Sequence, residues 1–399
     1  MNSENWLQWM LLAIPNLYLF FMCSTKWNAG TSISAGFLGV LILVMYGWKK
    51  QKICWNSSLF LLCYVFFMGS VVLASWLTGD KASFQLSIKF LSYSLPFWLL
   101  YLILQQSPSL FQSTFWGMLT GSWVLLALTC QDILHPLKDG RVHASFASAN
   151  NFAMCLEAIL PLLWLETLQV RKEYKNSARG KVLFVVALLT SILLTGALVL
   201  SKSRGGIAGF LLGAVTVVIA SLLQKKKDWP LQKRLIVLVV ALGVVAVGVF
   251  RGTLAFNQRS YDGERLLLVR SAYHMWEDHK LYGVGFQQWN RVYQAKYILP
   301  GAKEPTLSLA HNNVANFFSG TGTLGGLGYL FFTFGSLAVL IRKLDQTRDN
   351  IYGKMMVWVW LAFFIHGMVD NSLYARFNTR LYFAMWGISL AAFLPLKKA

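Results

Sequence analysis

The sequence predicts an all-α, polytopic integral membrane protein, and three observations lead to that prediction. Of its 399 residues, 56% are hydrophobic. Only 13% are charged, whereas a soluble domain carries about 25%. The hydrophobic residues also gather in long runs, and a helix needs about 20 apolar residues to cross a bilayer. These features exclude a soluble globular protein, and no segment with the two-residue period of a strand competes with helices.

We expect twelve such helices, joined by mostly short polar connections. Pro15, Pro96 and Pro161 lie inside predicted spans and are expected to kink them, as membrane helices tolerate. The whole chain, residues 1–399, is expected to form one membrane domain, because it shows no internal repeat and no separate soluble segment. The predicted spans are 6–23, 32–48, 58–78, 85–105, 110–130, 152–169, 182–201, 207–223, 233–250, 323–341, 355–370 and 381–396.

One connection, residues 251–322, is too long and too polar to lie in the membrane. It is rich in cationic and aromatic residues, and we expect it to contain helices. Asp262 is the expected N-cap of a helix that begins near Gly263 and carries Arg265 in its first turn. The free N–H groups of that helix end add a secondary attraction for an anion.

The placement of Lys and Arg predicts the orientation. If the N-terminus is cytoplasmic, Lys and Arg are much more numerous in the inner connections than in the short outer ones. The positive-inside rule therefore places both termini in the cytoplasm and the long connection outside. The first apolar run follows no basic segment, so we expect a retained span and not a removed signal peptide.

Two other classes of function are excluded by composition. The net charge of +20 comes mainly from the connections between apolar runs, so it reports topology and not a nucleic-acid-binding face. The five cysteines form no C-x-x-C pair and no disulfide framework, and packing is the expected role of each. The outer connections also contain no His/Cys/Asp/Glu cluster with the spacing of metal ligands.

Several outer connections each bring an arginine, histidine or other polar residue to the same predicted surface. Arginine meets phosphate oxygens bidentately and stays charged at any working pH. A lipid-linked diphosphate keeps its tail in the bilayer and its phosphates at the interface, so residues at span ends have the right depth. An arginine there can also be a simple interfacial anchor. The candidates are Arg141, His143, Lys202, Arg204, Arg265, His311, His366, Asp370, Arg376 and Arg380.

Two further patterns have more than one interpretation. His366 and Asp370 are separated by four residues and would share one helical face, as either a proton relay or a structural hydrogen-bonded pair. The glycines between 320 and 328 resemble a phosphate-binding loop, but small residues in a membrane helix favour close helix packing.

Four motifs in order resemble one known family. They are R-V-H-A-S-F-A-S-A-N-N-F-A from Arg141, S-R-G-G at 203–206, G-E-R-L-L-L-V-R-S-A-Y-H-M-W-E-D-H-K-L-Y-G-V-G-F at 263–286, and H-N-x9-G-x-x-G from His311. Together they resemble the O-antigen ligase and O-antigen polymerase superfamily of bacterial inner-membrane glycosyltransferases. The resemblance covers about residues 140–330, and Lys280 stands where that family's pattern usually has proline.

This resemblance implies a GT-C-like, all-helical enzyme that needs no cofactor and no metal ion. Such an enzyme moves a glycan from undecaprenyl diphosphate to an acceptor at the periplasmic face of the bacterial inner membrane. By the resemblance, Arg204 and Arg265 match the diphosphate-binding arginines, Arg141 is a third, and His311 matches the catalytic histidine. Neutral histidine suits the removal of a hydroxyl proton near neutral pH. Supporting roles are expected for Arg270, Asn312, Lys202, Asp370 and Arg376.

The first functional hypothesis is an O-antigen ligase, whose acceptor is lipid A–core oligosaccharide. A polymerase of the same superfamily would share the donor and differ in its acceptor, another lipid-linked glycan. Under either hypothesis, the expected partners of this protein are the lipid-linked donor, the glycan acceptor and membrane lipid, with no nucleic acid. A transporter or flippase is the rival from another class. It would carry charged residues deep in its spans, where only Lys89, Glu157 and His366 are candidates.

Overall fold

The structure is a computed structural model, and its described part is helical without any β-strand. Nine helices in that part are long and apolar enough to cross a membrane. The prediction of an all-helical, polytopic membrane protein is therefore confirmed. The structure describes residues 3–24, 27–173, 177–223, 229–230, 232–237, 239–240, 243, 247–248, 251, 262–302, 306–307, 309–343 and 350–394.

The elements follow one another as a series of long helices interrupted by one group of shorter ones. The first half contains α1 (Ser3–Ser24), α2 (Asn28–Ile42), the π-helix η1 (Leu43–Trp48), α3 (Ser58–Leu77), α4 (Lys81–Ser92), α5 (Leu95–Leu104), α6 (Leu110–Leu134) and α7 (Ala149–Glu173). The second half contains α8 (Ala178–Leu200), α9 (Arg204–Leu223), α11 (Asp262–Asp278), α12 (Trp289–Val292), η2 (Tyr293–Tyr297), α13 (Asn313–Arg342), α15 (Ile351–Gly367) and α16 (Arg376–Ala392).

Nine of the twelve predicted spans are found as helices of membrane length, namely the first eight and the span at 323–341. The predicted span 355–370 is α15, an apolar helix of only 17 residues. The predicted span 381–396 is α16, also 17 residues long. The predicted span 233–250 lies only partly within the described residues.

Proline has different effects at its three predicted positions. Pro15 and Pro161 lie inside α1 and α7, which continue through them. The predicted span 85–105, by contrast, is divided into α4 and α5 by a turn at 93–94, and Pro96 is in the first turn of α5. The missing N–H of proline costs least at that place, because the first helical N–H groups have no partner within the helix.

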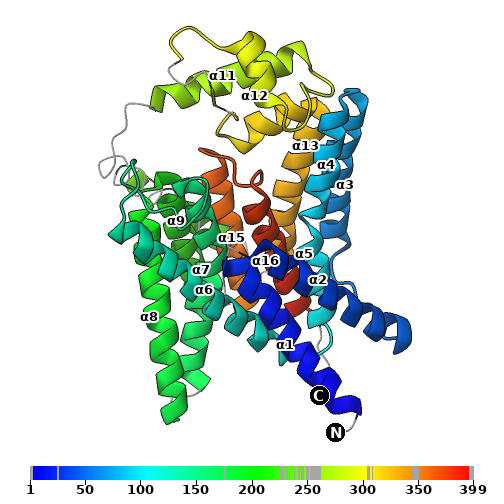
Figure 1. Ribbon diagram of the computed structural model, residues 1–399, viewed down its shortest axis with the longest axis vertical. Coiled ribbons are helices and arrows are strands. Elements are labelled where there is room, and N and C mark those ends of the chain that lie inside the picture. Colours follow the sequence, from blue (N-terminus) through cyan, green and yellow to red (C-terminus); the bar gives the residue numbers. More distant parts are fainter. Residues whose placement is uncertain are drawn as a thin grey trace.

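The long helices form a bundle whose two ends differ (Figure 1). Helix α13 packs along α3, α9 along α15, and α1 along α6. The two termini lie at one end of the molecule in Figure 1, and α11 and α12 lie at the other. We call the segment 262–302, which holds α11, α12 and η2, the cap. The cap has a small hydrophobic core, to which Ala310 is added from outside the cap. Its members within the cap are Leu268, Ala272, Met275, Trp289, Tyr293 and Tyr297.

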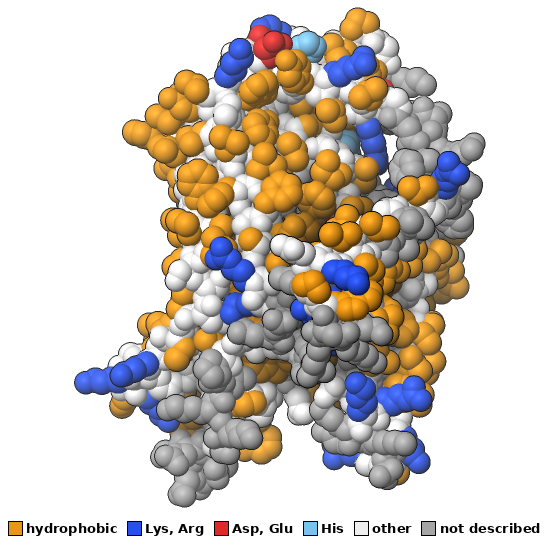
Figure 2. Space-filling view, turned by 180° about the vertical axis from the view of Figure 1, so that it is seen from behind, with side chains coloured by type: hydrophobic (Ala, Val, Ile, Leu, Met, Phe, Trp, Pro, Cys, Tyr) orange, Lys and Arg blue, Asp and Glu red, His pale blue; other side chains and the backbone are white. Residues whose placement is uncertain are grey.

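The surface matches a bundle that is surrounded by lipid. Figure 2 shows hydrophobic side chains crowded over the upper part of one face, whereas Lys and Arg are more numerous toward its lower end. Exposed apolar side chains such as Leu62, Trp76 and Leu193 belong to the long helices. In an aqueous protein so many of them would be unfavourable, but hydrocarbon is a favourable solvent for them.

The cap is held to the bundle at a break in α13. Gly322 has φ 63° and ψ −165°, so the backbone is not helical there. The chain at 280–285 passes this break and exchanges backbone hydrogen bonds with it. The amides of Val284 and Gly285 donate to Ser319 and Gly320 at 2.9 and 3.0 Å, and the Thr323 amide donates to Lys280 at 2.7 Å. Gly283 and Gly322 face each other so closely that a Cβ on either would overlap the opposing backbone.

The glycine-rich stretch at 320–328 is thus used for packing within the described structure. Gly328 lies against Ser70 and Phe67 of α3, and Gly320 and Gly322 lie against the 281–285 segment. The break also explains why the sequence pattern of a span begins only at 323. Helix α13 itself begins at Asn313, but its first turns lie under the cap and carry more polar residues.

Candidate functional site

Several of the polar groups that the sequence singled out meet at one short segment, which we call the site turn. It comprises residues 366–372, where α15 ends at Gly367. A Cβ at Gly367 would collide with the side-chain amide of Asn313, so the end of α15 lies directly against the start of α13. Four segments that are distant in sequence contact the site turn, and each brings a polar side chain.

The central contact joins His311 and Asp370. The imidazole Nδ1 of His311 is 2.9 Å from Oδ1 of Asp370. A carboxylate can only accept a hydrogen bond, so Nδ1 carries the proton and Nε2 of the neutral ring has its lone pair. Within the described residues, Nε2 has no hydrogen-bond partner, and the His311 side chain is 22% exposed. The histidine is therefore oriented as a base with an accessible nitrogen.

Asp370 is held in its ionised form by the groups around it. Burial alone would raise the pKa of this carboxyl. The hydrogen bond and charge of His311, with the charges of His366 and Arg265, outweigh burial and place the pKa below its usual range. The amide of Asn371 also donates to Oδ1 at 2.8 Å, and the side-chain amide of Asn150 donates to Oδ2 at 2.5 Å. A carboxylate with these three donors is a fixed anion, which suits it to orient an imidazole.

Arg141 reaches the same carboxylate through Asn150. Its Nη2 donates to Oδ1 of Asn150 at 2.8 Å, and its Nε donates to the carbonyl of Ser201 at 2.7 Å. The Asn150 amide then donates to Asp370. The segment that carries Arg141 is fixed from α6, because Oδ2 of Asp132 accepts from the amides of His143 and Ala144 at 2.8 and 2.7 Å.

Arg265 and Arg204 approach the site turn from two other helices. Arg265, in the first turn of α11, donates from Nη1 to the carbonyl of Val369 at 2.7 Å. Arg204 is the first residue of α9. Its neighbour Gly205 lies against His366 and Val369, since a Cβ there would be 2.7 Å from a carbon of each. The two arginines that resemble diphosphate-binding residues thus come from segments that both touch Val369.

Asn312 and Asn313 fix the backbone on which His311 stands. The Asn312 side chain caps α13 by accepting from the Ala315 amide at 3.0 Å, and it donates to the carbonyl of Met368 at 2.8 Å. Asn313 donates to Oγ of Ser372 at 2.8 Å. His311 itself has φ 49°, a left-handed conformation that is uncommon outside glycine. Two asparagines therefore tie the start of α13 to the site turn and hold this conformation.

The remaining candidates lie around this cluster or away from it. Lys202, in the turn between α8 and α9, brings its Nζ near Gly140, beside the Arg141 segment. Arg270 lies on the exposed surface of α11, more than a turn beyond Arg265. Arg376 donates to Oδ1 of Asn28 at 2.7 Å and so contacts α2 instead of the site turn. The geometry gives Arg376 no contact with the His311 and Asp370 pair.

The predicted pairing of His366 with Asp370 is wrong. Helix α15 ends at Gly367, so the two side chains do not continue along one helical face. Nδ1 of His366 is 2.8 Å from Glu157 of α7, and its Nε2 is 3.4 Å from Oγ of Ser203. Both His366 and Glu157 are almost fully buried. This buried pair fixes the first residue of the site turn, whereas the Asp370 carboxylate accepts its hydrogen bond from His311.

Three of the contributing residues had no role assigned from the sequence, although each lies in one of the four motifs. They are Asn150, Asn313 and Ser203, which bind side chains of the site. The only signal available was the Asn150–Asn151 pair at the start of a predicted span. Amides there are commonly simple helix caps, and their partners lie up to 220 residues away in the chain.

No group of three or more His, Cys, Asp or Glu side chains is arranged to hold a metal ion in the part of the chain that the structure describes. The ionisable side chains around the site turn are instead arginines, Asp370, the buried Glu157 and two histidines. This set can bind an anion and move a proton.

Fold and site together define a polytopic membrane protein that presents a histidine base and several arginines at one end of its helical bundle. Residues 189–330, about a third of the chain, match the family model described as O-antigen ligase. The resemblance to the O-antigen ligase and polymerase superfamily is thereby confirmed over that segment, which contains Arg204, Arg265 and His311. Arg141 and Asp370 lie outside it. No curated protein matches the chain.

Proposed function

We propose that this protein is an O-antigen ligase, which transfers a polysaccharide from undecaprenyl diphosphate to lipid A–core oligosaccharide at the periplasmic face of the bacterial inner membrane. The observation that carries the proposal is the convergence of the His311 and Asp370 pair with Arg265 and Arg204 on one turn. The family match over 189–330 supports the same reaction class.

In the proposed reaction, an acceptor hydroxyl attacks the anomeric carbon of the donor sugar. Nε2 of His311 takes the hydroxyl proton as the new C–O bond forms. The bond between the anomeric carbon and the phosphate oxygen breaks, and the lipid diphosphate departs with the electron pair. Asp370 keeps the imidazole in the required tautomer and stabilises the imidazolium that forms. A positioned base of this kind contributes about 10²–10⁴-fold in rate.

The arginines have the complementary role. Negative charge grows on the diphosphate as the bond breaks, and fixed guanidinium groups stabilise that charge more in the transition state than in the ground state. Arg265 and Arg204 would contact the diphosphate directly. Arg141 already donates two hydrogen bonds, from Nε to Ser201 and from Nη2 to Asn150. It would therefore support Asp370 through Asn150 and also add positive charge.

The proposal is tested with purified protein in lipid nanodiscs, undecaprenyl-diphosphate-linked glycan and lipid A–core. We expect transfer of glycan to lipid A–core, and a loss of about 10²–10⁴-fold in His311→Ala. Donor affinity and the thermal midpoint should stay at wild-type values in that variant. His135→Ala is the matched control, because His135 is exposed in the 135–140 connection and contributes only its backbone amide to a hydrogen bond.

Two results would contradict the proposal in different ways. If His311→Ala loses donor affinity, stability and turnover together, the histidine is structural and not the base. If the wild-type protein lengthens a lipid-linked glycan but leaves lipid A–core unmodified, the protein is the polymerase of the same superfamily. The mechanism at His311 would then stand, and the assigned acceptor would be wrong.

A further inference from the structure

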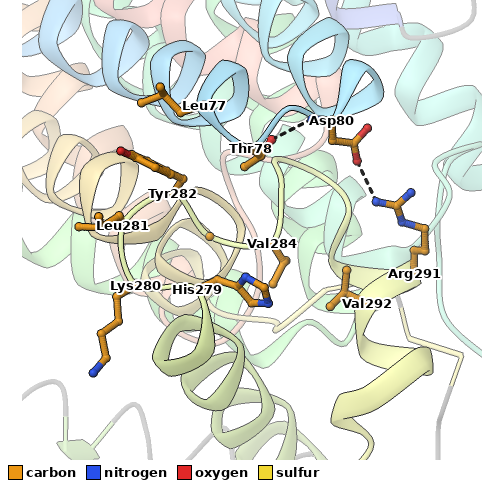
Figure 3. Close-up of a pocket in the computed structure, with 11 residues that line it drawn as sticks. Leu77, Thr78, Asp80, His279, Lys280, Leu281, Tyr282, Val284, Arg291 and Val292 are labelled. Carbon is orange, nitrogen blue, oxygen red and sulfur yellow. Dashed lines mark hydrogen bonds and ion pairs between the residues drawn. The ribbon is translucent and has the colours of Figure 1, made fainter.

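A cavity of about 570 Å³ opens between the cap and the end of α3 (Figure 3). One wall is the turn that joins α3 to α4 and includes Thr78 and Asp80. The opposite wall is the 279–284 segment of the cap, with Arg291 and Val292 closing one side. Its size is that of a typical site for a small organic ligand. None of these residues belongs to the site turn.

The lining of this cavity combines polar groups with flat apolar ones. Nη2 of Arg291 is 2.8 Å from Oδ2 of Asp80, so a guanidinium and a carboxylate stand side by side at the opening. Figure 3 shows the ring of His279 on the same side as Val284 and Val292, whereas the Lys280 side chain extends away from it. Within the described residues the His279 ring has no hydrogen-bond partner. Tyr282 adds an exposed aromatic ring.

Such a lining suits a saccharide. The edge of a sugar ring carries hydroxyl groups that both donate and accept, and a neighbouring guanidinium and carboxylate can satisfy both kinds. The C–H faces of the ring pack against aromatic and aliphatic side chains such as Tyr282 and Val284. A bare phosphate would be favoured less, because Asp80 places a negative charge in the wall.

The cavity is also placed for a second substrate. It joins α13 at the Gly322 break, through the hydrogen bonds of Val284 and Gly285 to Ser319 and Gly320. His311 lies just before the start of the same helix. At 1.5 Å per residue, the seven residues from Asn313 to Gly320 span roughly 10 Å. A glycan in the cavity would thus have its next sugar within reach of the histidine.

The arginines and the cavity lie on different sides of α13. Arg265 and Gly205, the neighbour of Arg204, both lie against Val369 just after α15, whereas the cavity is bounded by the end of α3. Helix α13 packs against both α15 and α3. In a displacement the nucleophile enters opposite the leaving group. With the diphosphate on the arginine side, the acceptor therefore approaches from the side of α3.

We infer that the cavity between the α3–α4 turn and the 279–284 segment binds a sugar of the acceptor glycan. His279, Tyr282 and the Asp80–Arg291 pair supply its recognition. This inference rests on the proposed function, since it assigns the second substrate of that reaction. The ligand class is a lipid-anchored saccharide whose lipid part lies in the bilayer beside the end of α3.

The test uses full-length protein in nanodiscs and measures KM separately for donor and acceptor. His279→Ala removes a hydrogen-bonding group from the cavity wall. His279→Trp places a larger ring in the cavity, and because His279 is exposed the substitution should not disturb the packed core. Both are expected to raise the KM for lipid A–core about tenfold, the effect of about 1.4 kcal/mol of lost binding. The KM for the undecaprenyl-diphosphate donor should not change. His274→Ala is the matched control, an exposed histidine of α11 that pairs with Glu277 outside the cavity.

A binding measurement separates failure of this inference from failure of the proposed function. Purified lipid A–core, and in a second arm undecaprenyl-diphosphate-linked glycan, is titrated into wild-type and His279→Trp protein without turnover. Weaker binding of lipid A–core, with unchanged binding of the undecaprenyl-diphosphate-linked glycan, supports the cavity as the acceptor site. An unchanged acceptor KM and unchanged binding in His279→Trp would overturn the inference, even if His311→Ala behaves as proposed. A rise confined to the donor KM would also overturn it.

Discussion

A histidine whose Nδ1 donates to a carboxylate has only Nε2 with which to accept a proton. In this protein that constraint comes from Asp370, which is itself held by Asn150 and by the Asn371 amide. The chain thereby fixes the tautomer of His311 without using any charged residue of a membrane span. The orientation of the base and the ionisation of Asp370 are two results of the same hydrogen bond.

We predict that Asp370→Asn reduces kcat by roughly 10²–10⁴-fold, with little change in donor KM. The amide can present its N–H to His311 and so favour the opposite tautomer, in which Nε2 carries the proton. Asp278→Asn is the comparison variant, because it makes the same substitution at an exposed carboxylate of the cap that pairs with Lys296 away from the site turn. If Asp370→Asn keeps wild-type kcat, the pair does not take part in proton transfer.

We also predict that Arg265→Lys and Arg204→Lys each lose most transfer activity while their expression stays normal. Lysine keeps the positive charge but lacks the planar fork that meets two phosphate oxygens. Arg171→Lys is the control, since Arg171 lies at the far end of α7 and packs over the Phe184 ring. Wild-type donor affinity in both test variants would show that these arginines are interfacial anchors.

At the scale of single residues, His311, Asp370 and the arginines could be predicted from the sequence, but the predicted partner of Asp370, His366, was wrong. Spacing of four residues indicates a shared face only while a helix continues, and α15 ends between His366 and Asp370. The true partners are 59 residues away for Asp370 and 209 for His366. Local spacing holds no information about such contacts.

Among the elements, α13 combines two parts that differ in kind. The first turn of α13 contains Asn313, which contacts the site turn. The part of α13 beyond Gly322 is an apolar span that packs against α3. The break lets the backbone of the 280–285 segment enter at hydrogen-bonding distance. Backbone contacts on α13 therefore align the cap with His311, which lies just before the same helix.

We predict that Gly322→Ala lowers the thermal midpoint and the transfer rate together. The positive φ alone costs an alanine on the order of 1–3 kcal/mol, and the added Cβ would overlap the carbonyl of Leu281. Gly263→Ala is the matched control, because nothing lies within 4 Å of a Cβ there. Equal midpoints for the two variants would show that the break does not depend on glycine.

The elements were largely foreseeable because hydrocarbon imposes a simple rule of length and apolarity. Nine predicted spans have matching helices of membrane length. The division of 85–105 into α4 and α5 was not foreseen, because proline is compatible with both a kinked helix and a new start. Helices α15 and α16 have about the predicted length, but they begin at Ile351 and Arg376, a turn or more before the predicted starts at 355 and 381.

On the scale of the whole molecule, the termini lie at one end and the cap at the other (Figure 1). We predict that reporter fusions at Lys227 and at Gln288 report opposite compartments, with Lys227 in the cytoplasm. The reason is the concentration of Lys and Arg in the connections on the side of the termini. Fusions at both positions that report the same compartment would refute this topology.

The site turn follows α13 in the chain, so Asp370 is synthesised 59 residues after its partner His311. During synthesis a ribosome delivers α1 to α13 into the membrane before the carboxylate that orients His311 has been made. Nascent or prematurely released chains that stop before 370 would thus hold most of the bundle and none of the paired base. If the proposed function is right, such unfinished chains would bind a glycan donor without being able to transfer its glycan.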